Sequence, residues 1–108
     1  MPLLYDFEVD STQELVERLS GNVKKRRLEK GLSRSALSLM SGVPVSTIAK
    51  FEQKRSISLQ GFVALAKALG YAGEVKQLLD EPKFATMKEL DTINKNKNRK
   101  RGRNEFNR

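Results

Sequence analysis

Two short amphipathic segments, separated by a glycine, stand out in the pattern of apolar and polar positions. The first covers residues 34–41, where Leu37 and Met40 recur at helical spacing. Ser33 precedes it, and a serine hydroxyl there can accept a hydrogen bond from an unpaired amide of the first helical turn. Gly42 follows it, and glycine commonly takes the left-handed conformation that ends helices. These features predict a helix over residues 34–41.

The second segment covers residues 45–53, with Ile48 and Phe51 as its apolar positions. Pro44 precedes it; proline cannot continue the preceding helix, but its restricted φ suits a helix start. Two helices joined by a glycine turn within about 20 residues form the helix-turn-helix arrangement, whose second helix enters the major groove of DNA. The stretch therefore predicts a DNA-reading unit, and a two-helix hairpin of unrelated function is the alternative.

Three further helices are predicted around this pair. Residues 11–14, Ser-Thr-Gln-Glu, have the form of a capping box, which predicts a helix from there to about residue 30. Ser58 is a suitable N-cap for a helix over residues 59–69, and a shorter helix over residues 73–79 ends before Pro82. Their expected core positions are Leu15, Leu19, Val23 and Leu28, then Phe62, Leu65, Ala66 and Leu69, then Val75, Leu78 and Leu79.

The five helices define an all-α bundle over residues 11–81, with segments of different composition on either side. Residues 1–10 alternate weakly between apolar and polar positions, which suits either a short strand that pairs across a dimer or an arm without fixed structure. Residues 82–94 predict an amphipathic turn or short helix. Its apolar residues recur at three-residue steps: Phe84, Met87, Leu90 and Ile93. Residues 95–108 predict a disordered basic tail.

Charge is segregated along the chain as well as positive overall. The net charge is +8, but residues 1–17 carry five acidic and no basic residues. Residues 18–76 carry twelve basic and three acidic residues, and residues 95–108 carry seven basic and one acidic. Two separate basic blocks favour a polyphosphate partner over a scattered solubilising charge.

Other classes of function find little support in the composition. The chain has no cysteine and no histidine, so disulfides, zinc fingers and histidine-based catalysis are excluded. No nucleophile with a base, metal-ligand cluster or phosphate-binding glycine loop is recognisable, so we expect neither an enzyme nor a cofactor. No apolar run approaches the length of a membrane span, and the acidic N-terminus is unlike a signal peptide, so we expect a cytoplasmic protein.

The segment from about residue 15 to residue 80 resembles the lambda-repressor/Cro (XRE) helix-turn-helix family. The residues that carry the resemblance are Leu37, Ser38, Gly42, Ile48, Phe51 and Glu52. It implies a five-helix lambda-repressor-like bundle with an ion pair between Arg27 and Glu52 that joins the first helix to the recognition helix. At the start of the second helix of the motif, two residues depart from the family: Pro44 replaces a usual capping serine or threonine, and Val45 replaces a usually polar residue.

The same resemblance implies which side chains contact DNA. Val45, Ser46 and Lys50 fall on base-reading positions; valine can touch a thymine methyl, serine can bond several bases, and lysine best matches guanine. Phosphate contacts orient such a protein, and base contacts confer its sequence preference. The positions expected to bind phosphate are Arg34, Thr47, Lys54, Arg55 and Ser56.

A second surface is suggested by Leu39 and Met40, which occupy positions that are mostly polar and exposed in the family. They mark either a protein interface or a site where one of them packs under a tail residue such as Phe84. The trailing segment, 82–103, is similar to that of HipB-type antitoxins, which partner HipA-type kinases. The interface candidates are therefore Leu39, Met40, Phe84, Met87 and Leu90.

Together these observations predict a dimeric, sequence-specific transcriptional repressor that binds a palindromic operator in double-stranded DNA. The narrower hypothesis is a HipB-like antitoxin of a type II toxin–antitoxin operon that represses its own operon and binds a HipA-like kinase toxin. The alternatives are a stand-alone phage-type repressor, and a protein-interaction adaptor whose tail binds nucleic acid without sequence preference.

Overall fold

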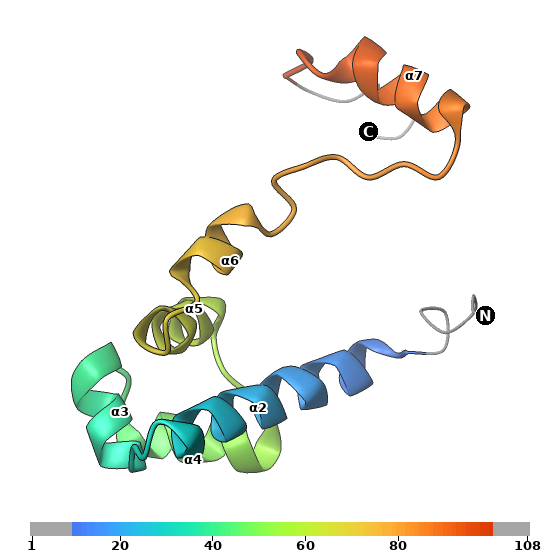
Figure 1. Ribbon diagram of the computed structural model, residues 1–108. Coiled ribbons are helices and arrows are strands. Elements are labelled where there is room, and N and C mark those ends of the chain that lie inside the picture. Colours follow the sequence, from blue (N-terminus) through green and yellow to red (C-terminus); the bar gives the residue numbers. More distant parts are fainter. Residues whose placement is uncertain (1–9, 101–108) are drawn as a thin grey trace. The chain divides into compact units, whose positions relative to one another are not determined.

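The computed structural model describes residues 10–100, and this part of the chain is helical, without strands (Figure 1). Its helices are α2 (Thr12–Glu29), α3 (Arg34–Ser41), α4 (Val45–Lys54), α5 (Leu59–Ala68), α6 (Ala72–Gln77) and α7 (Met87–Asn96). The chain divides into two units, Met1–Lys76 and Gln77–Arg108. The expectation of a strand or arm over residues 1–10 falls, except for Asp10, outside the described residues, as does the last part of the predicted tail.

The helices begin where short-range polar signals place them. The predicted capping box is confirmed: the Glu14 amide donates to Ser11 Oγ at 3.0 Å, and the Ser11 amide donates to Glu14 Oε1 at 2.7 Å. Ser33 and Ser58 cap α3 and α5 in the same way, each accepting from an amide three residues later at 3.0 Å. The predicted starts of these three helices are therefore correct to within one residue.

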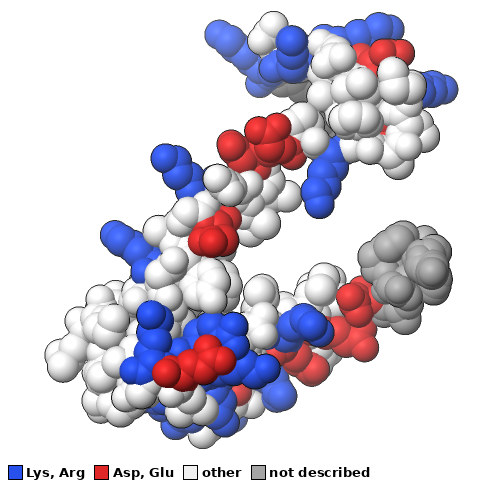
Figure 2. Space-filling view, in the orientation of Figure 1, with Lys and Arg blue, Asp and Glu red and all other residues white. Residues whose placement is uncertain are grey.

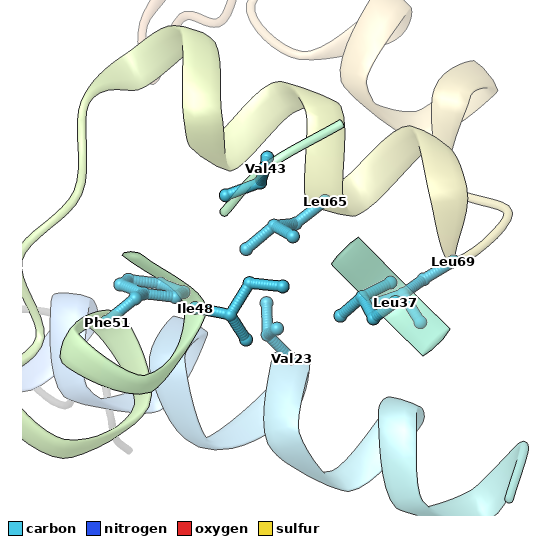
Figure 3. Packing of buried hydrophobic residues seen from close by; sticks show 7 residues of the cluster. All are labelled: Val23, Leu37, Val43, Ile48, Phe51, Leu65 and Leu69. Carbon is cyan, nitrogen blue, oxygen red and sulfur yellow. The ribbon is translucent and has the colours of Figure 1, made fainter. Parts of the chain in front are cut away.

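The core lies among α2, α3, α4 and α5 (Figure 3). Helix α3 packs against α4 and α5, and α2 packs against α4. The rings of Phe51 and Phe62 meet edge to face, with centroids 5.9 Å apart, a geometry that adds to the burial of both side chains. The buried cluster consists of Val23, Leu37, Val43, Ile48, Phe51, Leu65 and Leu69.

The prediction of which α2 residues face the core is wrong in part. Val23 is buried, but Leu15, Leu19 and Leu28 are each about half exposed. The buried residues of α2 are Ser20, Val23 and Arg27. The two polar members have partners on α4, because Ser20 Oγ donates to the Phe51 carbonyl at 2.8 Å and Arg27 pairs with Glu52. A polar residue can occupy an interior position when a second helix supplies its hydrogen bonds.

The last predicted helix of the bundle is shorter than expected. Helix α6 ends at Gln77, and Leu78 and Leu79 are 71% and 93% exposed, so their prediction as core residues is wrong. Leu79 has a left-handed backbone with φ of +66°, which cannot continue a right-handed helix. Only the partly buried Val75 of the three expected residues turns inward.

Gly61 has a packing role that the sequence pattern does not reveal. In the sequence it is only a weak point in the helix over residues 59–69. In the structure, a Cβ at this position would lie 3.0 Å from Ile57 Cγ1 and 3.1 Å from Ser58 Oγ. Ile57 packs against the core and Ser58 caps α5, so glycine allows both side chains to occupy their places.

The second unit contains α7, which lies where the sequence predicts an amphipathic turn or short helix. Thr86 caps it by accepting from the Glu89 amide at 3.1 Å, and Glu89 accepts in turn from the Ala85 amide. The helix extends to Asn96, two residues into the segment predicted as a basic tail. It has no buried residue, and Leu90 and Ile93 are its partly buried apolar positions.

Candidate nucleic-acid interface

A tight turn fixes the second helix of the predicted motif against the first. Gly42 has φ of +80°, and its amide donates to the Ser38 carbonyl at 2.8 Å, so the predicted left-handed end of α3 is confirmed. Val43 then turns into the core, where it is 6% exposed. Pro44 occupies the N-cap of α4 and makes no side-chain cap. The turn therefore sets the direction of α4 through backbone geometry and one buried side chain.

A buried carboxylate joins three helices behind this turn. Glu52 of α4 receives Arg27 Nε of α2 at 2.7 Å and Arg34 Nε of α3 at 3.1 Å. The Glu52 side chain is 1% exposed, and the Arg27 side chain 7%. Arg27 also donates to the Leu32 carbonyl at 2.8 Å. The pair implied by the family resemblance is thus present in the structure, and Arg34 shares the same carboxylate.

The two arginines determine the charge state of this carboxylate. Burial acts to raise the pKa of Glu52, but the hydrogen bonds and positive charges of Arg27 and Arg34 outweigh it. The pKa of Glu52 is therefore held below its ordinary value of 4.5. Glu52 is ionised at neutral pH, so it orients both guanidinium groups and links α2 and α3 to α4.

The side of α4 away from the core is polar and exposed. Ile48 and Phe51 face inward, whereas Ser46 and Lys50, four residues apart, lie exposed on the other side of the helix. Val45 begins the helix and is 41% exposed. The three expected base-reading residues are therefore all accessible at the N-terminal half of α4.

One polar residue of this side was not identified from the sequence. Gln53 is exposed and follows Ser46 by seven residues, which places it two turns further along the same side. The sequence pattern placed it at the end of the helix predicted over residues 45–53 without a contact to DNA, and α4 continues one residue further, to Lys54. The seven-residue spacing is the signal that identifies it, and its amide offers both a donor and an acceptor.

The expected phosphate-binding residues surround α4 in different environments. Lys54, Arg55 and Ser56 are exposed, and Thr47 is half-buried. The Arg34 side chain is 31% exposed, with its Nε on Glu52. Arg55 ends α4 in a left-handed conformation with φ of +58°, which is uncommon for a residue other than glycine or asparagine. Its backbone thus turns sharply, and its exposed side chain donates to the Gln53 carbonyl at 3.2 Å.

Basic charge gathers at the end of the helical domain that carries α4. Figure 2 shows Lys and Arg side chains over the part of the domain where α2 ends and α3 and α4 lie. The contributing exposed residues of α2 include Lys24 and Lys25, and Lys30 follows directly after it. This positive surface beside an exposed polar helix can attract a polyanion and position it for side-chain contacts.

The predicted protein-interface residues lie in both units. Leu39 on α3 is 89% exposed and Met40 is 54% exposed. In the second unit, Phe84 and Met87 are exposed and Leu90 is half-buried. Within residues 10–100, no group of histidine, cysteine, aspartate or glutamate is arranged to hold a metal ion. None of the described helices has both the length and the apolar character needed to cross a bilayer.

In the comparison with protein-family models, residues 23–75 match the family described as helix-turn-helix. The matched segment begins at Val23 of α2 and ends within α6. It therefore contains the turn, the exposed side of α4 and the Glu52 cluster, which consists of Arg27, Arg34 and Glu52. The match supports the XRE-type family and a DNA-binding transcription regulator. Comparison with curated proteins and with solved structures found no match.

Proposed function

We propose, from an XRE-type helix-turn-helix domain over residues 23–75, that this protein is a sequence-specific transcriptional repressor that reads an operator with α4. The single observation that carries the proposal is the exposed side of α4, which presents Ser46 and Lys50 to solvent. On another side of the same helix, Glu52 anchors α4 to α2 and α3. A rigid helix with free donors and acceptors is what major-groove readout requires.

In this function the residues have separate roles. Lys50 donates to guanine, Ser46 bonds a neighbouring base, and Val45 packs on a thymine methyl. Phosphates are bound around α4, by Thr47 in its first turn, by Arg34 of α3, whose Nε lies on Glu52, and by Lys54, Arg55 and Ser56 at its end. Arg34 has a further role, because its Nε on Glu52 aims the remainder of the guanidinium while the pair holds α3 to α4.

The base-reading residues can be tested by DNA binding. We expect the chain to bind DNA upstream of its own gene in preference to random DNA, and Lys50→Ala and Ser46→Ala each to reduce that preference by about 1–3 kcal/mol, or roughly 5- to 150-fold. Lys67→Ala is the matched control, because Lys67 is an exposed lysine on α5. Fluorescence anisotropy at fixed salt measures both affinities, and retention of full preference in both variants would refute the assignment.

The basic C-terminal segment, residues 95–108, has a role that does not depend on base sequence. Its seven basic residues would add phosphate contacts and release counterions from DNA. Deleting residues 97–108, which leaves α7 intact, should weaken binding to operator and random DNA equally and make the salt dependence shallower. A selective loss of operator binding would instead show that the tail reads a groove.

We further propose that the protein is a HipB-like antitoxin, which binds a HipA-like kinase toxin and represses their shared operon. Two exposed apolar surfaces support this proposal, Leu39 with Met40 on α3 and Phe84 with Met87 in the second unit. Neither surface is needed for contacts by the outward side of α4. Neighbouring exposed apolar side chains suit contact with a protein partner better than contact with water.

Co-expression tests the antitoxin role directly. We expect a kinase encoded by a neighbouring gene to co-purify with this chain, and Met87→Asp or Leu39→Asp to release it while operator binding persists. Leu59→Asp is the matched control, because Leu59 is a 78% exposed leucine at the start of α5, outside both surfaces. If no kinase gene adjoins this one and no partner co-purifies, the stand-alone repressor is the better description.

A further inference from the structure

The N-terminal half of α2 has an apolar stripe that the helical domain leaves uncovered. This half of the helix runs out beyond α3, α4 and α5 (Figure 1). Leu15 and Leu19 are one turn apart on one side of it, and they are 49% and 45% exposed. The buried residues of α2 begin only at Ser20. We call Leu15 and Leu19 the α2 stripe.

Charge divides α2 into two halves of opposite sign. Residues 10–17 contain three acidic and no basic residues, Asp10, Glu14 and Glu17, and all three are exposed. Residues 18–30 contain six basic residues and one acidic residue. Lys24, Lys25 and Lys30 are exposed among them. Two copies of α2 that run in opposite directions would therefore present complementary charges to each other.

We propose that the α2 stripe is an interface with a second copy of this chain, in which the two α2 helices pack antiparallel. Antiparallel packing sets the acidic half of each helix against the basic half of the other, whereas parallel packing would set like charges side by side. If the Leu19 side chains of the two copies meet at the two-fold axis, residue 14 of one helix lies opposite residue 24 of the other. Glu14 is then only one residue out of line with Lys25 of the second copy. Such a surface is self-complementary, as a two-fold interface must be.

This interface deepens the proposed function, because a two-fold dimer matches a palindromic operator. It uses a part of α2 that lies largely before the matched helix-turn-helix segment and is separate from α4. Two leucines from each copy form a small apolar surface, so we expect a reversible monomer–dimer equilibrium. The association can be measured without DNA, so its failure is distinguishable from failure of base reading.

Sedimentation equilibrium of the full chain without DNA tests the stripe. We expect Leu19→Glu and Leu15→Glu each to weaken self-association at least about tenfold, equivalent to about 1.4 kcal/mol. Leu28→Glu is the matched control, because Leu28 is also a half-exposed leucine of α2, but it lies nine residues from Leu19. Nine residues are about two and a half turns, which places Leu28 on the opposite side of the helix.

Exchange of charge tests the direction of packing. Glu14→Lys and Lys25→Glu should each weaken association severalfold, and the double variant should restore it, because the two charges face each other across the interface. A chain that is monomeric at all concentrations, or equal effects of Leu19→Glu and Leu28→Glu, would overturn the proposal. A monomer whose melting temperature falls on Leu19→Glu would also overturn it, since the stripe would then be covered within one chain.

Base-specific DNA binding is measured on the same variants. If the stripe variants remain monomeric but keep their preference for operator over random DNA, the interface and the reading side of α4 act independently. If wild-type protein dimerises through the stripe but shows no preference for any DNA, the interface stands and the proposed function fails.

Discussion

Helices α4 and α7 are both ten residues long and amphipathic, but different forces hold them. Helix α4 begins at Pro44 without a side-chain cap, and it buries Ile48 and Phe51 almost completely. Helix α7 begins with a cap in which Thr86 accepts from the Glu89 amide and Glu89 accepts from the Ala85 amide, and it buries no residue. Tertiary contacts therefore support α4, and local hydrogen bonds support α7.

The difference shows what each helix can do. A reading helix must hold its side chains in fixed positions against base edges, so its anchors have to be rigid. The Glu52 cluster and the core provide that rigidity for α4. An amphipathic helix with an uncovered apolar side is instead suited to docking on a partner, which is the role that the antitoxin proposal gives to α7. The following predictions test this contrast, beginning with the largest effect.

Removing the charge of Glu52 should have the largest effect on stability. Glu52→Gln leaves Arg27 buried without its carboxylate, and breaking a buried pair in this way costs about 3–5 kcal/mol. Urea denaturation measures the free energy of unfolding. Glu29→Gln is the control, because Glu29 is 58% exposed and its 2.8 Å pair with Arg26 should contribute at most about 1 kcal/mol. Similar losses in both variants would contradict the anchoring role of Glu52.

Truncating an apolar side chain should lower the free energy of unfolding much more in α4 than in α7. Ile48→Ala in α4 removes a fully buried side chain, so the free energy of unfolding should fall by about 2–5 kcal/mol. Met87→Ala in α7 removes a side chain that is 69% exposed, and it should change the free energy by less than about 0.5 kcal/mol. Thermal melts followed by circular dichroism measure both, and a large loss for Met87→Ala would show that α7 is packed on a core.

Acid should weaken the stabilisation that the ionised Glu52 carboxylate gives to the packing of α4. The folded-state pKa of Glu52 lies below its ordinary value of 4.5, so the carboxylate contributes its full stabilisation above about pH 4.5. That contribution is lost as the pH falls from 4.5 through the lower, folded-state pKa. The unfolding free energy of wild-type protein should therefore fall over this range more steeply than that of Glu52→Gln. Parallel pH profiles would show that Glu52 is not the group responsible.

Loss of an N-cap should also act differently in the two units. Ser33→Ala removes the cap of α3, whose Leu37 is buried in the core, so the global free energy of unfolding should fall by about 1 kcal/mol. Thr86→Ala removes the corresponding cap of α7. It should lower the helicity of residues 87–96, as measured by NMR chemical shifts, without moving the main unfolding transition. A shift of that transition by Thr86→Ala would mean that the two units unfold together.

The end of α4 should show the smallest change in stability and a separate effect on binding. Arg55→Gly places glycine at a left-handed position, so stability should stay the same or rise by up to about 1 kcal/mol. DNA affinity should fall, because a proposed phosphate contact is lost. Denaturation and anisotropy on one sample compare the two quantities. Unchanged DNA affinity would remove Arg55 from the proposed contacts.

The helical signals were largely readable in the sequence because they act over a few residues. The serine caps, the glycine end of α3 and the apolar spacing within α3, α4 and α5 involve neighbours in the chain. The inner face of α2 was not readable in this way. Its buried Ser20 and Arg27 depend on a carbonyl and a carboxylate supplied by α4 about 30 and 25 residues away.

The same division applies to the candidate site. Spacing and family resemblance predicted that Ser46 and Lys50 face outward, and both are exposed, since a helix presents positions four apart on one side. Gln53 lay within the helix predicted over residues 45–53, seven residues after Ser46, so its place on the outward side could have been read from the spacing but was not assigned. The second bond of Glu52, to Arg34, depends on the distance between α3 and α4.

The sequence alone thus determined where most helices begin, which residues of α4 and α5 are apolar inside positions, and that an acidic N-terminal segment precedes two basic blocks. Only the tertiary structure decided which polar groups are buried and which leucines are left exposed. The physical reason is that short-range hydrogen bonds and helical periodicity are properties of neighbouring residues. Burial of Arg27 or exposure of Leu19 depends instead on which helix lies opposite.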